Sequence, residues 1–306
     1  MDKPKIVVVG SINMDLVATV DRFPVPGETV RSKSFTTVPG GKGANQAAAA
    51  ALAGAQVTMV GRVGKDIFGD SCLDNLKSKG VDIQFIKRDE QEPTGNAMIS
   101  VDTGGQNELI YTAGANSRVT VQDAEDAKDT IQAADMIILQ FEIPMETVSG
   151  VVSLASELGT RVIVNPAPAD TPTAGLLEKI DYFVPNESEA KQLTGLHVVD
   201  IDTAAEAAKE LFNRGTKHVI VTMGPQGAVM YDTNGLLRVP TRQVKAVDVT
   251  AAGDSFIGAL AVALSTEQDL PDAVDFACSA ATLSVTKLGA QPSIPTREEI
   301  DRYMKQ

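Results

Sequence analysis

Short apolar runs that alternate with helix-like segments are the feature that most restricts how this chain can fold. The runs are apolar at consecutive positions, as in strands that are buried on both faces. They predict strands at 5–9, 57–60, 136–139, 161–164, 182–184 and 218–222. Segments that favour helices lie between them, at 44–52, 69–79, 121–133, 145–158 and 203–213. Alternating strands and helices form βαβ units, so we predict a three-layer α/β/α fold with a mostly parallel central sheet.

Other segments interrupt this alternation. Residues 15–31 and 94–111 are polar and alternate as antiparallel strands do, the second folded about the pair Gly104-Gly105. A pairing of 228–231 with 236–239 about an Asn-Gly turn predicts a hairpin on the far side of the sheet. No Pro- or Ser-rich linker divides the chain. We therefore expect residues 1–306 to form one domain, with the first two segments as a small β-strand lid.

Composition and charge limit the classes of function. Apolar residues make up 43% and charged residues 22%, as in ordinary globular proteins. The chain has 27 Lys and Arg residues and 40 Asp and Glu residues, which gives a net charge of −13. This balance argues against binding nucleic acid or an anionic membrane through bulk electrostatics. No apolar run reaches the roughly 18–20 residues that a membrane span needs.

The cysteine and histidine content gives no sign of a zinc site. Cys72 and Cys278 have no pairing pattern, and His197 and His218 are well separated from them in the sequence. We interpret these four residues as structural. The opening Met-Asp-Lys-Pro leads directly into a strand-like segment, so we expect no signal peptide and a cytoplasmic protein.

The segment 247–264 carries the strongest sign of chemistry. Small residues at 250–253 lead into an apolar helix with Asp254 in its first turn. A helix start exposes N–H groups without partners, and small side chains let an anion approach them. A carboxylate beside an anion suggests a base that accepts the proton of an attacking hydroxyl, as in phosphoryl transfer. An ordinary helix start is the alternative, because Asp is favoured at the positive end of the helix dipole.

A glycine cluster before the first predicted helix is the second candidate. Gly40, Gly41 and Gly43 would let the backbone approach a ligand closely, while Lys42 and Asn45 add polar groups. The spacing matches neither the Walker P-loop nor the Gly-x-Gly-x-x-Gly fingerprint. Taken alone, the cluster fits a tight helix entry equally well.

Polar residues also follow several predicted strands. Asn13 and Asp15 would point the same way in an extended chain and could bind adjacent hydroxyls of a sugar, with an Asx turn as the alternative. Glu142 follows another strand. The segment 186–189 fits either a helix N-cap or contact with phosphates and hydrated Mg²⁺, and 222–227 is a glycine turn. Ligands of parallel sheets bind beyond the carboxyl ends of the strands, so we expect one site there.

Residues 40–45 (Gly-Gly-Lys-Gly-Ala-Asn) and 248–254 (Asp-Val-Thr-Ala-Ala-Gly-Asp) resemble the two signatures of the ribokinase-like (PfkB) family of carbohydrate kinases. Segments 10–15, 186–189 and 287–293 support the resemblance, which covers essentially the whole chain and is greatest to the family's ribokinases. It implies the ribokinase-like fold and ATP-dependent phosphorylation of the 5-hydroxyl of D-ribose. The alternatives are a kinase for another furanose or a nucleoside (deoxyribose, fructose or adenosine) and a non-catalytic sugar- or nucleotide-binding regulator.

The resemblance also implies roles for individual residues. Asp254 would be the general base, with the backbone N–H groups of Ala251, Ala252 and Gly253 as an anion hole. The sugar-binding positions are Asn13, Asp15, Gly41, Lys42, Asn45, Glu142 and Asp254. The nucleotide-binding positions are Asn186, Thr222, Gly224, Gly227 and Gly253, with Cys278 near the expected adenine. Glu189 closes an Asn-x-x-Glu motif that is linked to Mg²⁺ and phosphate.

Ribokinases also use a monovalent cation, usually K⁺, so the resemblance implies a second ion site. The matching positions, several through backbone carbonyls, are Asp248, Thr250, Ser284, Lys287, Gly289 and Ser293. Such an ion would order the anion-hole loop without touching substrate. Val249 and Ala251 stand where many relatives have Thr and Gly, at positions whose side chains catalysis does not need. Family members are often dimers, so we expect a homodimer joined through the lid.

Overall fold

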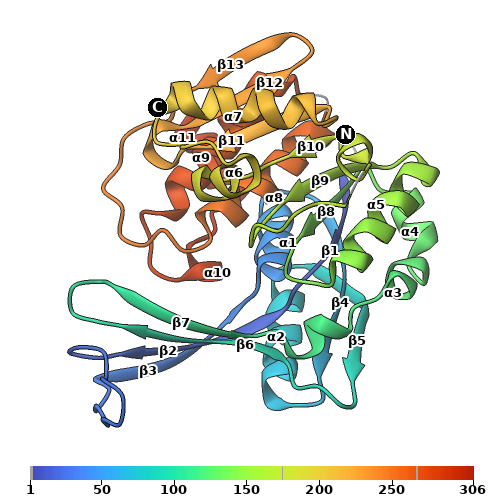
Figure 1. The fold of residues 1–306 in the computed structure, drawn as a ribbon. Coiled ribbons are helices and arrows are strands. Elements are labelled where there is room, and N and C mark those ends of the chain that lie inside the picture. The colour runs from blue at the N-terminus through green and yellow to red at the C-terminus, as the bar shows by residue number, and fades with distance from the viewer. Residues whose placement is uncertain (1–2, 174, 267) are drawn as a thin grey trace.

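The computed structural model describes residues 3–173, 175–266 and 268–306 (Figure 1). A nine-stranded sheet lies between two layers of helices, and a four-stranded sheet projects from one side of this body. The three-layer fold predicted from the alternating pattern is confirmed. Within the described ranges, no helix is both long and apolar enough to cross a membrane.

The main sheet is parallel except at one edge. Its strands lie in the order β13 (Gly235–Val239), β12 (Ala228–Asp232), β11 (His218–Thr222), β10 (Tyr182–Phe183), β9 (Arg161–Asn165), β8 (Met136–Gln140), β1 (Lys5–Val9), β4 (Gln56–Gly64) and β5 (Val81–Asp89). Strands β11, β12 and β13 pair antiparallel, which confirms the predicted hairpin and places it at the sheet edge. The opposite edge strand, β5, lies outside the predicted strands.

Consecutive apolar residues on the strands form two cores, one on each face. On β1, Ile6 and Val8 pack into one core, and Val7 and Val9 pack into the other. The first core is covered by α1 (Lys42–Leu52), α2 (Ile67–Ser78), α8 (Ala252–Ser265), α9 (Leu270–Ser284) and α11 (Arg297–Met304). The second is covered by α3 (Val121–Glu125), α4 (Lys128–Gln132), α5 (Met145–Leu158), α6 (Glu187–Thr194) and α7 (Ile201–Asn213).

The predicted helix at 121–133 is two shorter helices, α3 and α4. The chain leaves helical geometry at Ala127, where φ is −101° and ψ is 13°. Ala127 is nevertheless buried, as are Ala124 and Ile131 on either side of it. The predicted apolar face therefore exists, but it is formed by two short helices instead of one long helix.

The lid is the four-stranded sheet, in the order β3 (Ser34–Gly40), β2 (Asn13–Thr19), β6 (Gly95–Val101) and β7 (Asn107–Thr112). The predicted lid range 15–31 ends too early, because β2 stops at Thr19 and the second strand begins only at Ser34. Pro24 and Pro26 lie in the intervening loop, and proline cannot donate to a strand ladder. The strands β2 and β6 pair parallel, whereas β6 and β7 form the hairpin expected about Gly104-Gly105.

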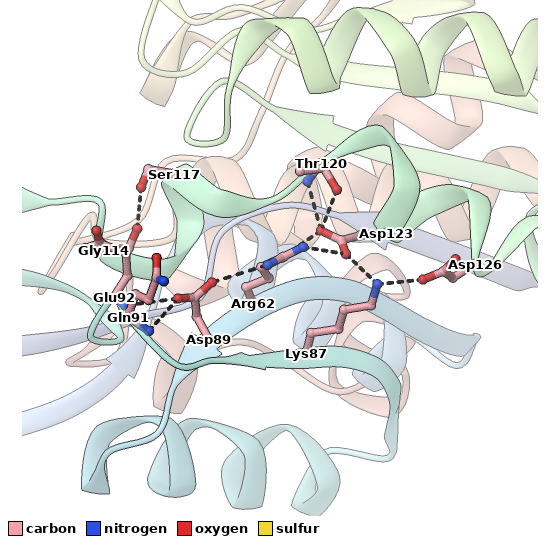
Figure 2. A network of polar contacts seen from close by, with 10 residues as sticks. All are labelled: Arg62, Lys87, Asp89, Gln91, Glu92, Gly114, Ser117, Thr120, Asp123 and Asp126. Atoms are coloured by element: carbon pink, nitrogen blue, oxygen red, sulfur yellow. Dashed lines mark hydrogen bonds and ion pairs between the residues drawn. The ribbon is translucent and has the colours of Figure 1, made fainter.

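A network of charged residues ties the lid's connections to the main sheet (Figure 2). Arg62 on β4 donates to Asp123 from Nε and Nη2, over 2.8 and 3.0 Å, and to Asp89 from Nη1 over 3.3 Å. Lys87 on β5 lies 2.8 Å from Asp123 and 2.6 Å from Asp126. Asp89 accepts two backbone N–H bonds from the turn that leads into β6, while Asp123 lies in the first turn of α3, which follows β7 in the chain. The network therefore anchors the chain on both sides of the hairpin β6–β7.

Replacing Asp123 with asparagine is expected to lower the free energy of unfolding by about 3 kcal/mol, because it removes the buried carboxylate that pairs with both Arg62 and Lys87 and leaves Arg62 only its 3.3 Å contact with Asp89. Burial alone would raise the pKa of Asp123, but hydrogen bonds from Arg62 and Lys87 hold it below the ordinary value. The stabilisation that the Asp123 carboxylate provides is thus fully present above its pKa in the unfolded chain, about 3.9. It is lost as the pH falls through the lower pKa that Asp123 has in the folded protein. Urea unfolding at pH 7 and at decreasing pH measures both effects.

Asp126→Asn is the matched control for this experiment. The Asp126 side chain is 42% exposed and pairs with Lys87 at the surface, where solvent screens the interaction, so a much smaller loss than for Asp123→Asn is expected. Equal losses for the two variants at pH 7 would contradict the anchoring role of Asp123.

Candidate active site

A cavity of about 190 Å³ lies beyond the carboxyl ends of β9, β10 and β11, at the starts of α1, α6 and α8. The predicted residues that line it come from four separate segments: Lys42, Asn186, Glu189, Thr222, Ala251, Ala252, Gly253 and Asp254. Asn165, Val249, Phe256 and Ile257 also contribute to its walls. Residues far apart in the sequence thus meet where open α/β sheets bind ligands.

Asp254 lies in the first turn of α8 and is 7% exposed. Its Oδ2 accepts a hydrogen bond from Asn45 Nδ2, and its Oδ1 accepts one from Gln46 Nε2, both at 2.9 Å. Asn45 and Gln46 belong to α1, which follows the glycine loop, so the two signature segments are in direct contact. The carboxylate is held by neutral donors and faces the cavity, which leaves it free to accept a proton.

The start of α8 has the shape of an anion site. Ala251 adopts the left-handed conformation, with φ at 60°, and is the N-cap residue. In the described part of the chain, no side chain caps this helix start. A Cβ added to Gly253 would meet nothing within 4 Å, so the space in front of its backbone is open. The N–H groups and the helix dipole therefore favour a negatively charged ligand here.

The lid supplies the next side of the site. Asn13 and Asp15 lie two residues apart on β2 and share one face, as predicted. Asn13 is buried, and its Oδ1 accepts a hydrogen bond from Asn116 Nδ2 at 2.7 Å. Asn116 also bonds both backbone groups of Ile12. Asn116 thus fixes the turn between β1 and β2, and its bond to Oδ1 sets the direction of the Asn13 side chain.

The glycine loop packs directly against this turn. Gly41 has φ at 89°, and a Cβ there would lie 2.7 Å from the backbone nitrogen of Asn13, so only glycine fits. Ser11 Oγ donates to Glu142 Oε2 at 2.6 Å, and the backbone nitrogen of Lys42 donates to the same oxygen at 3.2 Å. Glu142 therefore holds the loop against the end of β1.

Charges in the site perturb one another. Burial, with Glu142 and Asp254 nearby, raises the pKa of Asp15 to about 6. Burial also raises the pKa of Glu142. For Lys42, burial alone would lower the pKa, but the carboxylates of Asp254, Glu142 and Glu189 together raise it. The site is thus a group of acidic side chains around one ammonium, open to a neutral polyhydroxyl ligand.

The far side of the cavity is formed around α6. Asn186 and Glu189 make a reciprocal capping box: Asn186 Oδ1 accepts from Glu189 N at 2.9 Å, and Glu189 Oε2 accepts from Asn186 N at 2.8 Å. Both residues also line the cavity, so the two interpretations of this segment are compatible. Burial raises the pKa of Glu189.

Not every predicted nucleotide position reaches the cavity. Gly224 and Gly227 shape the turn after β11, where a Cβ on Gly227 would lie 2.1 Å from the Val239 carbonyl oxygen. Cys278 is 4% exposed in the core on α9 and does not line the cavity, and burial raises its pKa to about 12. The assignment of these three residues to nucleotide binding stays a prediction.

The predicted cation positions come together in two loops joined by Asp248. Its Oδ1 accepts from Thr250 N and Oγ1 at 2.9 and 2.6 Å, and its Oδ2 accepts from Gly289 N at 2.9 Å. Ser284 and Ser293 are fully buried and donate their hydroxyl hydrogens to backbone carbonyls, which leaves oxygen lone pairs available. The Lys287 ammonium pairs with Glu299, so only the carbonyl of Lys287 can serve a cation. This oxygen set fits a hard monovalent ion.

Sequence reasoning missed the amide side chains that support the site: Gln46, Asn116, Gln140 and Asn165. Gln46 and Asn165 were detectable in principle, since each follows a recognised motif or strand end. Asn116 lies in the short 3₁₀ helix η1 (Gly114–Arg118), and only the fold brings it to Asn13.

Comparisons with known proteins show what the whole chain is similar to. The pfkB family of carbohydrate kinases matches residues 3–297. A ribokinase of Staphylococcus aureus (strain COL) is 38% identical over 97% of this chain and 99% of its own length. A deoxyribokinase of Salmonella typhi is 36% identical over 98% of each chain. The solved structure of Arabidopsis thaliana ribokinase with ribose and ATP superposes with a TM-score of 0.94, at 32% identity over the whole of both chains.

The family match spans nearly the entire chain, and similarity to these relatives extends over both sheets. The fold is ribokinase-like, with the small sheet as its lid. The chain belongs to the pfkB family of carbohydrate kinases.

Proposed function

We propose that the protein transfers the γ-phosphoryl group of ATP to O5 of D-ribose, giving D-ribose 5-phosphate and ADP. The observation that carries the proposal is the position of Asp254, between the amide of Asn45 on the sugar side and the open start of α8 on the phosphate side. The similarity to a ribokinase solved with ribose and ATP supports both substrates.

In this reaction the 5-hydroxyl gives its proton to Asp254 as its oxygen bonds to phosphorus, and the bond to ADP breaks. Asn13, Asp15, Gly41, Lys42, Asn45 and Glu142 would hold the sugar. The N–H groups of residues 251–253 would stabilise the charge on the transferred group. Lys42 lies between the sugar-holding residues and the N–H groups of the helix start, and it would balance charge on the phosphates. Positioning and charge stabilisation supply the catalysis.

Two ions complete the proposal. Mg²⁺ would neutralise the phosphates, and it fits a site with few direct carboxylates because it retains several waters. Glu189, buried in the capping box at the cavity wall, would contact it through water. K⁺ would bind at the two loops that Asp248 joins, and activity is expected to fall when Li⁺ replaces K⁺. Equal activity in the two salts would overturn the K⁺ assignment.

Deoxyribose is the main competing substrate, because a deoxyribokinase is almost as similar to this chain as the ribokinases are. Adenosine and fructose are the other candidates, and a regulator without catalysis is the candidate outside the kinases. A coupled assay of ADP release with ATP, Mg²⁺ and K⁺ across pentoses, hexoses and nucleosides separates them. We expect the highest kcat/KM with D-ribose. A higher value for another sugar would reassign the substrate, and no sugar-dependent release would favour the regulator.

Ribose binding is expected to weaken as the pH falls below about 6, because Asp15 then becomes protonated and accepts fewer hydroxyl hydrogens. The KM for ribose should rise on the acid side while remaining steady from pH 7 to 8. Asp15→Asn should show a high KM with no such dependence. An unchanged wild-type KM between pH 7 and pH 5 would contradict the role of Asp15.

We also propose a homodimer joined through the lid. Phe35, Met98 and Ile110 are 61%, 46% and 63% exposed and share one face of the small sheet by strand register. Exposed apolar residues in such a group favour a protein interface. Ile110→Asp should convert the dimer to monomer in light scattering, while Val199→Asp, at a 69% exposed position in the main body, should not. A monomeric wild-type protein at micromolar concentration would overturn the proposal.

A further inference from the structure

Behind the carboxylate of Asp254 lies a connected set of three amide side chains. Gln46 and Gln140 are fully buried, and Asn165 lines the cavity. Gln46 Nε2 donates to Asp254 Oδ1 at 2.9 Å and to Asn165 Oδ1 at 3.2 Å. Gln140 Nε2 donates to Gln46 Oε1 at 2.7 Å. The set therefore links the base on α8 to the ends of β8 and β9 through α1.

The direction of each hydrogen bond is fixed by groups that can only accept. An ionised carboxylate accepts only, so Gln46 must turn its nitrogen toward Asp254 and its oxygen toward Gln140. At the other end, Asn165 Nδ2 donates to the Val184 carbonyl oxygen at 3.0 Å, which turns its own oxygen toward Gln46. Both ends impose the same orientation on Gln46. Gln140 must then turn its Nε2 toward Gln46 Oε1, because with its own oxygen there two acceptors would face each other.

Gln140 has no other evident role. Its Oε1 is buried without a hydrogen-bond partner among the described residues, an arrangement that costs stability. A Cβ added to Gly10 would lie 1.9 Å from this oxygen, so the glycine at the end of β1 makes room for the Gln140 side chain. An apolar side chain would fill the space without an unpaired oxygen. Among the described residues, the one hydrogen bond of the Gln140 side chain is its donation to Gln46.

We propose that Gln46 and Gln140 are positioning residues for the phosphoryl transfer: Gln140 locks the orientation of the Gln46 amide, and Gln46 holds Asp254 with a proton-accepting lone pair toward the sugar hydroxyl. The inference rests on the proposed function. It extends that function by assigning the control of the base to residues that do not touch the substrate.

The decisive variant is Gln140→Glu, which keeps the shape and changes the hydrogen-bonding polarity. While the new carboxyl is protonated it can donate to Gln46 as the amide does. Once ionised it only accepts, which turns the Gln46 amide and sets its oxygen against Asp254. Gln140 is connected to the Asp254 carboxylate through Gln46, and Glu142, whose carboxylate interacts with Lys42, follows Gln140 by two residues in the chain. We expect kcat relative to wild type to decrease as the pH rises from 5.5 to 8.5, to a loss of about 10- to 100-fold, with KM for ribose within about twofold.

Gln140→Leu removes the donor without adding a charge and should lower kcat equally at every pH. Gln132→Glu, at an exposed position on α4, is the matched control and should behave as wild type. Identical pH profiles for Gln140→Glu and Gln140→Leu would overturn the proposal, because packing alone would then explain the loss. Wild-type kcat in both variants would overturn it as well.

If the Gln140 variants do not fold, Gln46→Met carries the same test, because it fills a similar volume without a donor. Ribose affinity from calorimetry should stay within about threefold of wild type, while the single-turnover rate falls about 10- to 100-fold. An unchanged single-turnover rate would overturn the inference. Wild-type protein in each assay separates the two claims: a wild type without ribose-dependent ADP release rejects the proposed function, whereas an active wild type with unaffected variants rejects only the positioning role.

Discussion

Asp254→Asn is expected to reduce ribose-dependent ADP release by at least about 100-fold while ribose still binds. The new amide has the shape of the carboxylate but cannot take the proton of the 5-hydroxyl. Its oxygen can face Gln46 Nε2, whose orientation Gln140 and Asn165 fix. Its nitrogen then faces Asn45, whose Oδ1 has no partner among the described residues and can turn to accept. Substitution should therefore leave the fold and most of the sugar contacts intact.

Steady-state kinetics and calorimetric ribose binding measure this prediction together. Asp275→Asn, at an exposed position on α9, is the matched control and should have wild-type kcat. Turnover within tenfold of wild type in Asp254→Asn would show that another group accepts the proton. Loss of ribose binding in proportion to turnover would instead assign Asp254 to substrate binding alone.

Gly253→Ala is expected to change stability and activity in opposite directions. The added methyl meets no protein atom within 4 Å, and alanine is favoured over glycine inside a helix by about 0.5–1 kcal/mol. The unfolding free energy should therefore rise by up to that amount. The same methyl enters the open space before the N–H groups at the start of α8, where the transferred phosphate would lie. Losing one such donor typically costs about 100- to 1000-fold in kcat.

Gly104→Ala in the lid turn is the matched control, since the atoms nearest its new methyl belong to Asp102, the closest at 3.2 Å, and the residue lies in the exposed β6–β7 turn. Thermal unfolding and kcat should both stay near wild type there. A Gly253→Ala variant with increased stability and unreduced kcat would contradict the anion hole. Reduced stability would contradict the open space in front of Gly253.

The sequence was sufficient to predict the layers of the fold because its strands are apolar on both faces. Residues 5–9 and 218–222 match β1 and β11 at both ends, and 145–158 matches α5. The edge strand β5 was missed because only its two end residues are buried, the others are exposed or partly buried, and it carries charges such as Lys87. The second lid strand was misplaced because the proline loop between Thr19 and Ser34 has no periodic pattern of its own.

The residues of the candidate site also fall into two groups, those that the sequence predicts and those that only the fold reveals. Motifs beside a strand end or helix start, such as Asn13, Lys42 and Asp254, could be found from local pattern and resemblance, and the fold brings them to one region. A supporting residue such as Asn116 could not, because no predicted strand or helix start adjoins it and its contact with Asn13 is made 103 residues away in the chain. A buried amide in a strand looks like any other polar residue until the fold shows what it bonds.

Identification of the reaction product tests the central claim most directly. The wild-type protein is incubated with Mg·ATP, K⁺ and D-ribose, and the products are followed by phosphorus and carbon NMR. The account predicts one ADP for each D-ribose 5-phosphate formed, with the phosphate coupled to C5, and no transfer to 5-deoxyribose, which lacks the accepting hydroxyl. Phosphate on another carbon, or ADP release that does not depend on ribose, would contradict it.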